Sequence, residues 1–240
     1  MKSKYLKTGL YAAALAALLA TTAAQAAVVI VKDNALTSNI PGLTGFQTNG
    51  AQMSGLAVTA TFSGGLTETS VWATTSPTAG AADGAGWSLA VNGDTFSSNW
   101  NFVFDAPPVG TNGLGQLLSL VLNGTNALTV LDTTTPSPGT PGSAQGKNFA
   151  FTTGACDADA CDASATYGSA VGILPALPEQ DLYQRLSVAF ARANAPRTNF
   201  SFRQDTDNDS RFGVPEPSGL ALAGVALAAL GFSSRRRRRS

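Results

Sequence analysis

The feature of this sequence that most limits its fold is a series of short alternating segments between residue 27 and about residue 212. Apolar residues occupy every second position in residues 55–62 and again in residues 100–104. Alternation with a period of two is typical of a strand with one buried face. Because Gly, Asn, Ser and Pro separate these segments, we expect many short strands.

The remaining strand candidates follow the same logic. Two apolar runs, residues 117–122 and 127–131, flank Asn123-Gly124-Thr125-Asn126, which predicts a hairpin. Residues 182–190 fit an alternating strand or a helical turn, and we favour the strand. Further candidates are residues 68–74 and 87–91. The sequence therefore predicts an all-β fold, a single antiparallel β-sandwich of jelly-roll-like form, over residues 27–204.

The three tryptophans, Trp72, Trp87 and Trp100, allow two interpretations. Exposed on one face of a sandwich, they could stack on sugar rings. The commoner fate of a tryptophan in a strand is core packing. We favour the core for each of them.

The N-terminal segment has the pattern of a secretory signal. Three lysines precede an apolar run at residues 10–20, and Ala24-Gln25-Ala26 fits the small-x-small cleavage pattern. We expect a signal peptide over residues 1–26, removed by signal peptidase so that Ala27 becomes the mature N-terminus. An uncleaved membrane anchor is the alternative.

The two cysteines, Cys156 and Cys161, lie five positions apart in an acidic stretch. After export, a local disulfide is the expected state. A metal site is the alternative, although two thiols without histidine would hardly complete one.

The C-terminal segment has three successive parts. Pro215, Glu216 and Pro217 form an extended, exposed stretch, because proline does not fit a regular helix. An apolar run at residues 219–232 then predicts a transmembrane helix over residues 218–234, short for a bilayer. A basic tail follows and would stay on the cytoplasmic side; its residues are Arg235, Arg236, Arg237, Arg238 and Arg239.

These three parts together resemble the PEP-CTERM sorting signal of Gram-negative bacteria, here spanning residues 215–240. The resemblance implies processing by an exosortase, a membrane enzyme that cuts near the motif. It also implies an association with extracellular polysaccharide and biofilm. The stretch from Asn199 to Asp207 resembles, imperfectly, the Gln-Phe-x-x-Asp signature of one subgroup of these proteins.

Charge and composition exclude several functions. Only 12% of residues are charged, and residues 27–214 hold 7 basic and 14 acidic ones, a net charge of −7. An acidic body argues against nucleic acid as a partner. The chain contains no histidine, which removes the Ser-His-Asp triad and histidine-based zinc sites.

The best candidate for a metal site is the acidic stretch that we assign to a linker at residues 205–214. Asp205, Asp207 and Asp209 stand at alternate positions, as at the start of a calcium loop. Ser210 replaces the usual glycine, so a solvated linker without metal is the favoured interpretation. A weaker calcium candidate surrounds the cysteines at Asp157, Asp159 and Asp162.

These observations favour an exported surface or extracellular-matrix protein without enzymatic activity. It would first be anchored in the inner membrane and then have a structural or adhesive role in exopolysaccharide. One alternative is a carbohydrate-binding module of the same shape. The other is a polysaccharide-active hydrolase that uses two carboxylates, since a glycosidase needs only such a pair.

The signal peptide gives a direct prediction. The exported protein should begin at Ala27, because the small residues Ala24 and Ala26 place the cleavage site there. N-terminal sequencing of the exported protein measures this. Detection of Met1 on that protein would refute the assignment.

Overall fold

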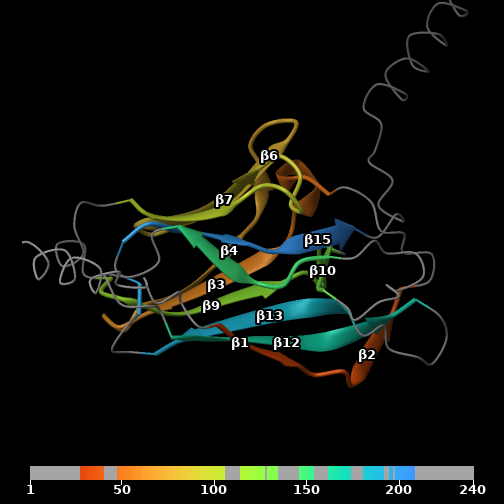
Figure 1. Cartoon of the computed structure of the whole chain (residues 1–240). Coiled ribbons are helices and arrows are strands. Elements are labelled where there is room, and N and C mark those ends of the chain that lie inside the picture. Colours follow the sequence, from red (N-terminus) through yellow and green to blue (C-terminus); the bar gives the residue numbers. More distant parts are fainter. Residues whose placement is uncertain are drawn as a thin grey trace, which may run out of the picture.

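A computed structural model describes residues 28–40, 48–105, 114–127, 129–134, 146–153, 162–173, 181–191, 195–196 and 198–208. Within these ranges the chain is nearly all β, as the sequence predicts. The single helical element among the described residues is a short 3₁₀ helix, η1 (Gly50–Met53). Figure 1 shows the strands gathered into two layers.

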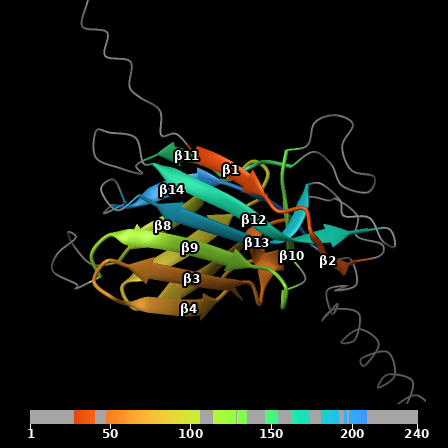
Figure 2. The same ribbon diagram turned by 90° about the horizontal axis from the view of Figure 1, so that it is seen from below.

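The larger sheet is built on six strands that lie side by side (Figure 2). Three shorter strands join it: β2 pairs with β12, and β10 pairs with β13 and β15. The six strands, in spatial order, are β1 (Val28–Lys32), β12 (Ala163–Gly172), β13 (Leu182–Phe190), β9 (Leu117–Asn123), β3 (Ala57–Phe62) and β4 (Thr67–Val71). The three shorter ones are β2 (Leu36–Asn39), β10 (Thr129–Asp132) and β15 (Asp205–Asn208).

The smaller sheet is antiparallel throughout its described strands. Its strands, in spatial order, are β11 (Ala150–Thr153), β14 (Phe200–Arg203), β8 (Trp100–Phe104), β7 (Trp87–Asn92), β6 (Ala79–Gly84) and β5 (Ala73–Thr74).

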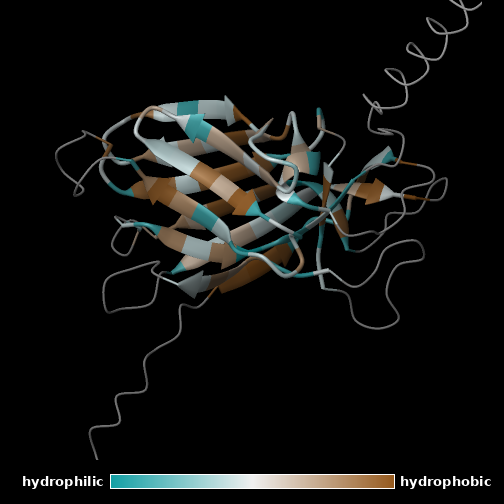
Figure 3. Ribbon diagram, turned by 90° about the horizontal axis from the view of Figure 1, so that it is seen from above, coloured by the Kyte–Doolittle hydropathy of each residue, from teal (hydrophilic) through white to brown (hydrophobic). Residues whose placement is uncertain are grey.

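The inner faces of the two sheets share one hydrophobic core. In β3, Val58, Ala60 and Phe62 are buried, while the residues between them are partly exposed, which confirms the predicted alternation. Figure 3 shows this alternation of hydrophobic and hydrophilic positions along the strands. Aromatic rings bridge the layers: the Phe62 and Trp87 centroids lie 6.5 Å apart, and those of Phe190 and Phe200 lie 6.0 Å apart. The strand interpretation of residues 182–190 is also confirmed.

The predicted hairpin around Asn123-Gly124 is wrong. Strands β9 and β10 do not pair with each other; each pairs with a different part of β13. Leu122 lies opposite Leu186, and Leu131 lies opposite Tyr183. Gly124 allows this kink because a Cβ there would lie 1.9 Å from the Thr129 carbonyl oxygen. After the loop the chain therefore continues along β13 in the same direction instead of reversing.

The expectation of a purely antiparallel arrangement also needs correction. Both β1 and β2 run parallel to β12, one beyond the other along its length. An alternating pattern indicates which face of a strand is buried, but it does not indicate the direction of the neighbouring strand. The parallel pairs therefore could not be inferred from the pattern.

Two residues mark places where the chain passes from one sheet to the other. Trp72 separates β4 of the larger sheet from β5 of the smaller sheet, and its indole Nε1 donates to the Gly50 carbonyl oxygen at 2.8 Å. Gln204 separates β14 of the smaller sheet from β15 of the larger one. Both side chains are buried.

The Trp72 crossing gives a stability prediction. A methyl group at Gly80 would lie 2.1 Å from Trp72 Nε1 and 2.3 Å from the Gly50 carbonyl oxygen, so Gly80→Ala must disrupt their hydrogen bond. We expect a loss of at least about 2 kcal/mol in the free energy of unfolding, measured by urea denaturation. Gly168→Ala, on β12 with no atom within 4 Å of the added carbon, is the control and should leave stability nearly unchanged.

Candidate functional site

Most of the sequence-predicted site residues lie outside the described part of the chain and stay predictions. No helix among the described residues is long and apolar enough to cross a membrane. The predicted transmembrane segment, 218–234, belongs to the residues that are not described. So do the cleavage residues Ala24, Ala26 and Ala27, the cysteines Cys156 and Cys161, the motif Pro215, Glu216 and Pro217, and the terminal arginines.

The described residues nearest to the motif form a buried polar network centred on Gln204. The Gln204 side-chain amide donates to the carbonyl oxygens of Asp132 at 3.1 Å and Asp205 at 2.7 Å. Its backbone carbonyl accepts a hydrogen bond of 2.8 Å from Trp100 Nε1. Buried polar groups must be hydrogen-bonded to be tolerated, so these contacts hold the crossing in one conformation.

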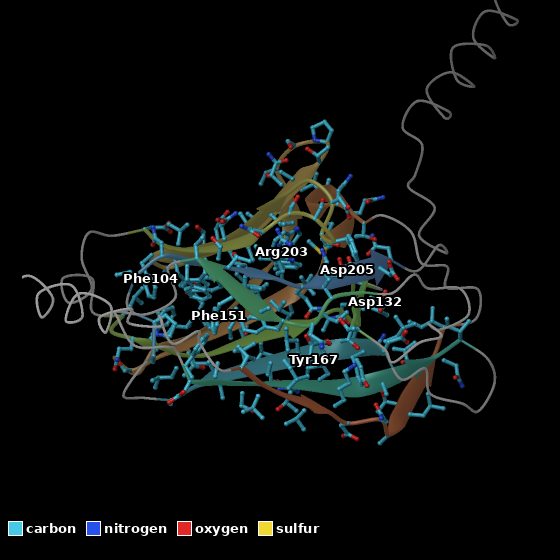
Figure 4. The ribbon with its side chains drawn as sticks, viewed as in Figure 1. Phe104, Asp132, Phe151, Tyr167, Arg203 and Asp205 are labelled. Atoms are coloured by element: carbon cyan, nitrogen blue, oxygen red, sulfur yellow. The ribbon has the colours of Figure 1, made fainter. Side chains whose placement is uncertain are left out.

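Tyr167 extends the network to the middle of β12. Its hydroxyl donates to Gln204 Oε1 and accepts a 2.6 Å hydrogen bond from the backbone N–H of Phe149. Burial raises the pKa of this phenol well above its usual value. Figure 4 shows Tyr167 on the larger sheet, with Asp132 at the last position of β10 and Asp205 at the first position of β15. The network thus connects β8, β10, β12, β14 and β15.

Asp205 fixes the start of the last described strand. Its carboxylate accepts hydrogen bonds from Thr95 Oγ1 at 3.0 Å and from the Thr206 backbone N–H at 2.9 Å. Burial raises the Asp205 pKa to about 6, although both hydrogen bonds act in the opposite direction. Nearby Asp94 raises this pKa further, while Lys147 lowers it.

The far end of β15 is held as well. Asn208 Nδ2 donates to the Gln52 carbonyl oxygen at 2.7 Å, and Asn208 Oδ1 accepts from Thr129 Oγ1 at 3.0 Å. Residues 205–208 are therefore a strand of the folded body, whereas the sequence analysis assigned them to a linker. The described body includes residues up to Asn208, and residues 209–214 of the predicted linker lie outside the described residues.

The described part of this stretch does not form the curled loop that the calcium-loop interpretation requires. Asp205 and Asp207 lie in extended backbone, buried and paired with β10, instead of in a curled loop. No group of three or more potential metal-ligating side chains occurs in the part of the chain that the structure describes. Asp209 and the cysteine-loop residues Asp157 and Asp159 are not described, and Asp162 is exposed.

A second polar cluster lies beside the first. Lys32 Nζ donates to the Thr134 carbonyl oxygen at 2.9 Å; burial lowers the Lys32 pKa, and the charges of Asp181 and Asp132 oppose this shift. Burial, with the charges of Asp181 and Asp33, raises the pKa of Tyr183 to about 12. The side chains of Asp132 and Asp181 are at most 1% exposed. Carboxylates buried so deeply cannot contact a polymer, so this pair does not suit a polysaccharide hydrolase.

All three tryptophans lie in the core, with exposed fractions of 0 or 1%. Each indole N–H has a partner inside the protein; that of Trp87 donates to Glu68 Oε2 at 2.9 Å. The expectation of core packing is confirmed, and sugar stacking on these tryptophans is excluded.

Sequence analysis missed Gln204, Tyr167 and Thr95. Tyr167 occupies an inward position of an alternating strand, which gives no sign that its hydroxyl has a specific partner. Gln204 follows an alternating segment directly, and the change of sheet at that point depends on contacts with distant residues.

The features above define an all-β protein whose last described strand precedes the C-terminal segment with the Pro-Glu-Pro motif. A comparison with protein families identifies that segment: the model of the PEP-CTERM protein-sorting motif matches residues 213–238. The chain thus carries a C-terminal segment that matches the PEP-CTERM sorting motif, as the sequence predicts. The motif implies export, a C-terminal membrane anchor before processing, and an exosortase as the processing partner. The comparisons with curated proteins and with solved structures found no match.

Asp205 gives a prediction about pH dependence. Its folded pKa of about 6 lies above the ordinary value of 3.8, so the folded state binds the proton more tightly. This group therefore lowers stability progressively as pH rises from about 4 to 6, and its cost persists above pH 6. This difference of about two pKa units corresponds to a loss of at most about 3 kcal/mol in the free energy of unfolding.

Asp205→Asn cannot ionise but keeps an oxygen to accept from Thr95. At pH 7.5 we expect the variant to unfold at a higher urea concentration than the wild type, and at pH 4 we expect equal midpoints. Asp83→Asn, at an exposed position on β6, is the control. The difference between its urea midpoints at pH 4 and pH 7.5 should equal that of the wild type. Equal stability of wild type and Asp205→Asn at pH 7.5 would contradict the argument.

Proposed function

We propose that this chain is a non-enzymatic surface or matrix protein of a Gram-negative bacterium. An exosortase cuts its membrane anchor, and the released body then has a structural or adhesive role in exopolysaccharide. The observation that carries the proposal is the sorting motif, which begins at residue 213, five residues after the last described strand. Signal peptidase would have removed residues 1–26 before this step.

The short connection supports a role for the body at the membrane surface before cleavage. Asn208 and Pro215 are seven residues apart, and an extended chain spans at most about 3.6 Å per residue, or about 25 Å in all. Since Asn208 is hydrogen-bonded to both Thr129 and Gln52, the anchored body stays close to the membrane. An exosortase would then act between a folded body and the bilayer.

The body suits a structural role. Its two sheets, taken as a single β-sandwich, share a core rich in aromatic residues, and the crossing at Gln204 is satisfied by hydrogen bonds. The buried tryptophans offer no aromatic platform for sugars. A structural or adhesive protein therefore agrees better with these observations than a module that stacks sugars on tryptophan.

Replacement of the motif tests the proposal in the host. With Pro215, Glu216 and Pro217 all changed to alanine, we expect the chain to remain full length at its C-terminus and to stay in the membrane fraction. The wild type should be found truncated in the surface or matrix fraction. Mass spectrometry of both fractions measures the two termini.

Ser210→Ala, outside the matched segment, is the control and should be processed like the wild type. Deletion of the exosortase should reproduce the effect of the motif variant. A full-length, lipid-free wild-type protein in the cytosol would contradict the proposal.

A further inference from the structure

The strands at the two ends of each sheet differ in how their open edges are protected. These end strands are β1 and β4 in the larger sheet and β11 and β5 in the smaller one. An end strand presents unpaired backbone N–H and C=O groups, and proteins protect such an edge by short length, bulges, charged side chains or covering contacts. Strand β5 has only two residues, and β11 has four with a register shift between Phe151 and Thr153. Both strands of the smaller sheet are therefore protected.

Strand β4 is protected by contacts with the smaller sheet. Ser70 Oγ donates to the Asp83 carbonyl oxygen at 2.7 Å. Glu68 Oε2 accepts from the Ala85 backbone N–H at 2.8 Å. These two side chains connect β4 to β6 and to the turn that follows it, so they close the sandwich on this side.

Strand β1, at the opposite end of the larger sheet, has none of these protections among the described residues (Figure 2). Its five residues pair with β12 in one unbroken register. Val29 and Val31 are 60% and 45% exposed. Lys32 is the only charged residue of the strand, and its Nζ donates to the Thr134 carbonyl oxygen at 2.9 Å. Its charge is thus held by another segment of the chain and does not protect the edge.

The hydrogen bonds of β1 indicate which backbone groups lie at its open edge. The Asp33 N–H donates to the Tyr167 carbonyl oxygen of β12 at 2.9 Å. Alternate residues of a strand face the same neighbour, so the odd-numbered residues of β1 also face β12. The even-numbered residues, with Ile30 at the centre, therefore direct their N–H and C=O groups away from β12, where no described strand pairs with them.

The open edge of β1 is complementary to itself. An antiparallel pair centred on Ile30 brings the even-numbered residues of two copies opposite each other, so each outward N–H meets a C=O. In this register Val29 of one copy lies opposite Val31 of the second copy, and the exposed β-branched side chains cover one another. The pairing uses the β1 edge of both copies, so it closes as a two-fold dimer.

We propose that β1 is a self-association surface, on which two copies of this protein pair edge to edge and antiparallel about Ile30. A second copy is the partner because an open backbone edge accepts an extended strand, and β1 itself supplies one in matching register. The membrane anchor that the sorting motif implies holds several copies on one surface before processing, which raises their local concentration. The inference concerns association and goes beyond the proposed function.

Sedimentation velocity over a concentration series tests the proposal, with the exported protein purified from the host. We expect a reversible dimer whose fraction rises with concentration. The double variant Val29→Lys with Val31→Lys places like charges opposite each other in the proposed register, so its dissociation constant should rise at least about ten-fold. The matched control is Val71→Lys, at a 60% exposed valine on β4, which should stay within about two-fold of the wild type.

Cysteine cross-linking tests the register. Residues directly opposite each other at non-hydrogen-bonded positions have the closest side chains in an antiparallel pair. Under mild oxidation, a mixture of the Val29→Cys and Val31→Cys proteins should form a disulfide between these two positions. Either variant alone should form at least about ten-fold less dimer linked through the new cysteine. Peptide mass spectrometry identifies the linked positions and distinguishes them from any linkage of Cys156 or Cys161.

Each contrary outcome has a distinct meaning. A wild-type protein that stays monomeric at every concentration, or a dimer that the folded lysine variant retains, would overturn the proposal. A dimer that Val71→Lys weakens as much as the lysine pair would overturn it too. If thermal unfolding shows that the lysine variant is not folded, the cysteine mixture decides. Absence of the wild type from the matrix fraction of the host would instead refute the proposed function and leave the dimer unaffected.

Discussion

The rest of the structure depends on the buried hydrogen-bond network of Gln204. This residue lies where the chain leaves the smaller sheet and enters the larger one, and its side chain hydrogen-bonds to backbone groups at the end of β10 and the start of β15. Its side-chain Nε2 donates to the backbone carbonyl oxygens of Asp132 and Asp205, and its side-chain Oε1 accepts from the Tyr167 hydroxyl. A hydrophobic residue there would leave several buried groups unsatisfied, which costs more than one lost hydrogen bond.

Hydrogen bonds hold β15 at Asp205 and at Asn208, and the segment that matches the PEP-CTERM motif begins five residues after Asn208. A body that unfolded locally at β15 would lengthen the tether to the membrane. Two effects on the ionisation of Asp205 oppose each other: its burial disfavours the ionised form at neutral pH, and its hydrogen bonds favour that form.

The polar residues of the larger sheet divide between two roles. Those on the inner side, such as Tyr167 and Gln204, are buried and stabilise one arrangement of strands. Those on the outer side are Thr and Ser hydroxyls that remain accessible. A sheet with one wet face accounts for polar outer residues in general. The small number of charged residues on this face agrees with the chain as a whole, of which only 12% is charged.

The sequence by itself indicated the secretory pattern, the PEP-CTERM motif, about half of the strands and, where residues alternate as in β3 and β8, the buried face of the strand. These features are local: a period of two, a cleavage pattern and a run of apolar residues can be recognised without knowing the neighbours. The core position of the tryptophans was the favoured of two interpretations, because tryptophan is usually buried.

Only the tertiary structure decided which strands pair, and with what direction. It placed β9 and β10 along β13 instead of against each other, and it set β1 and β2 parallel to β12. It also turned residues 205–208 from an acidic linker into a strand, because Thr95, Thr129 and Gln52 supply partners from distant positions. Pairing depends on contacts between residues far apart in the chain, and a period of two contains no information about them.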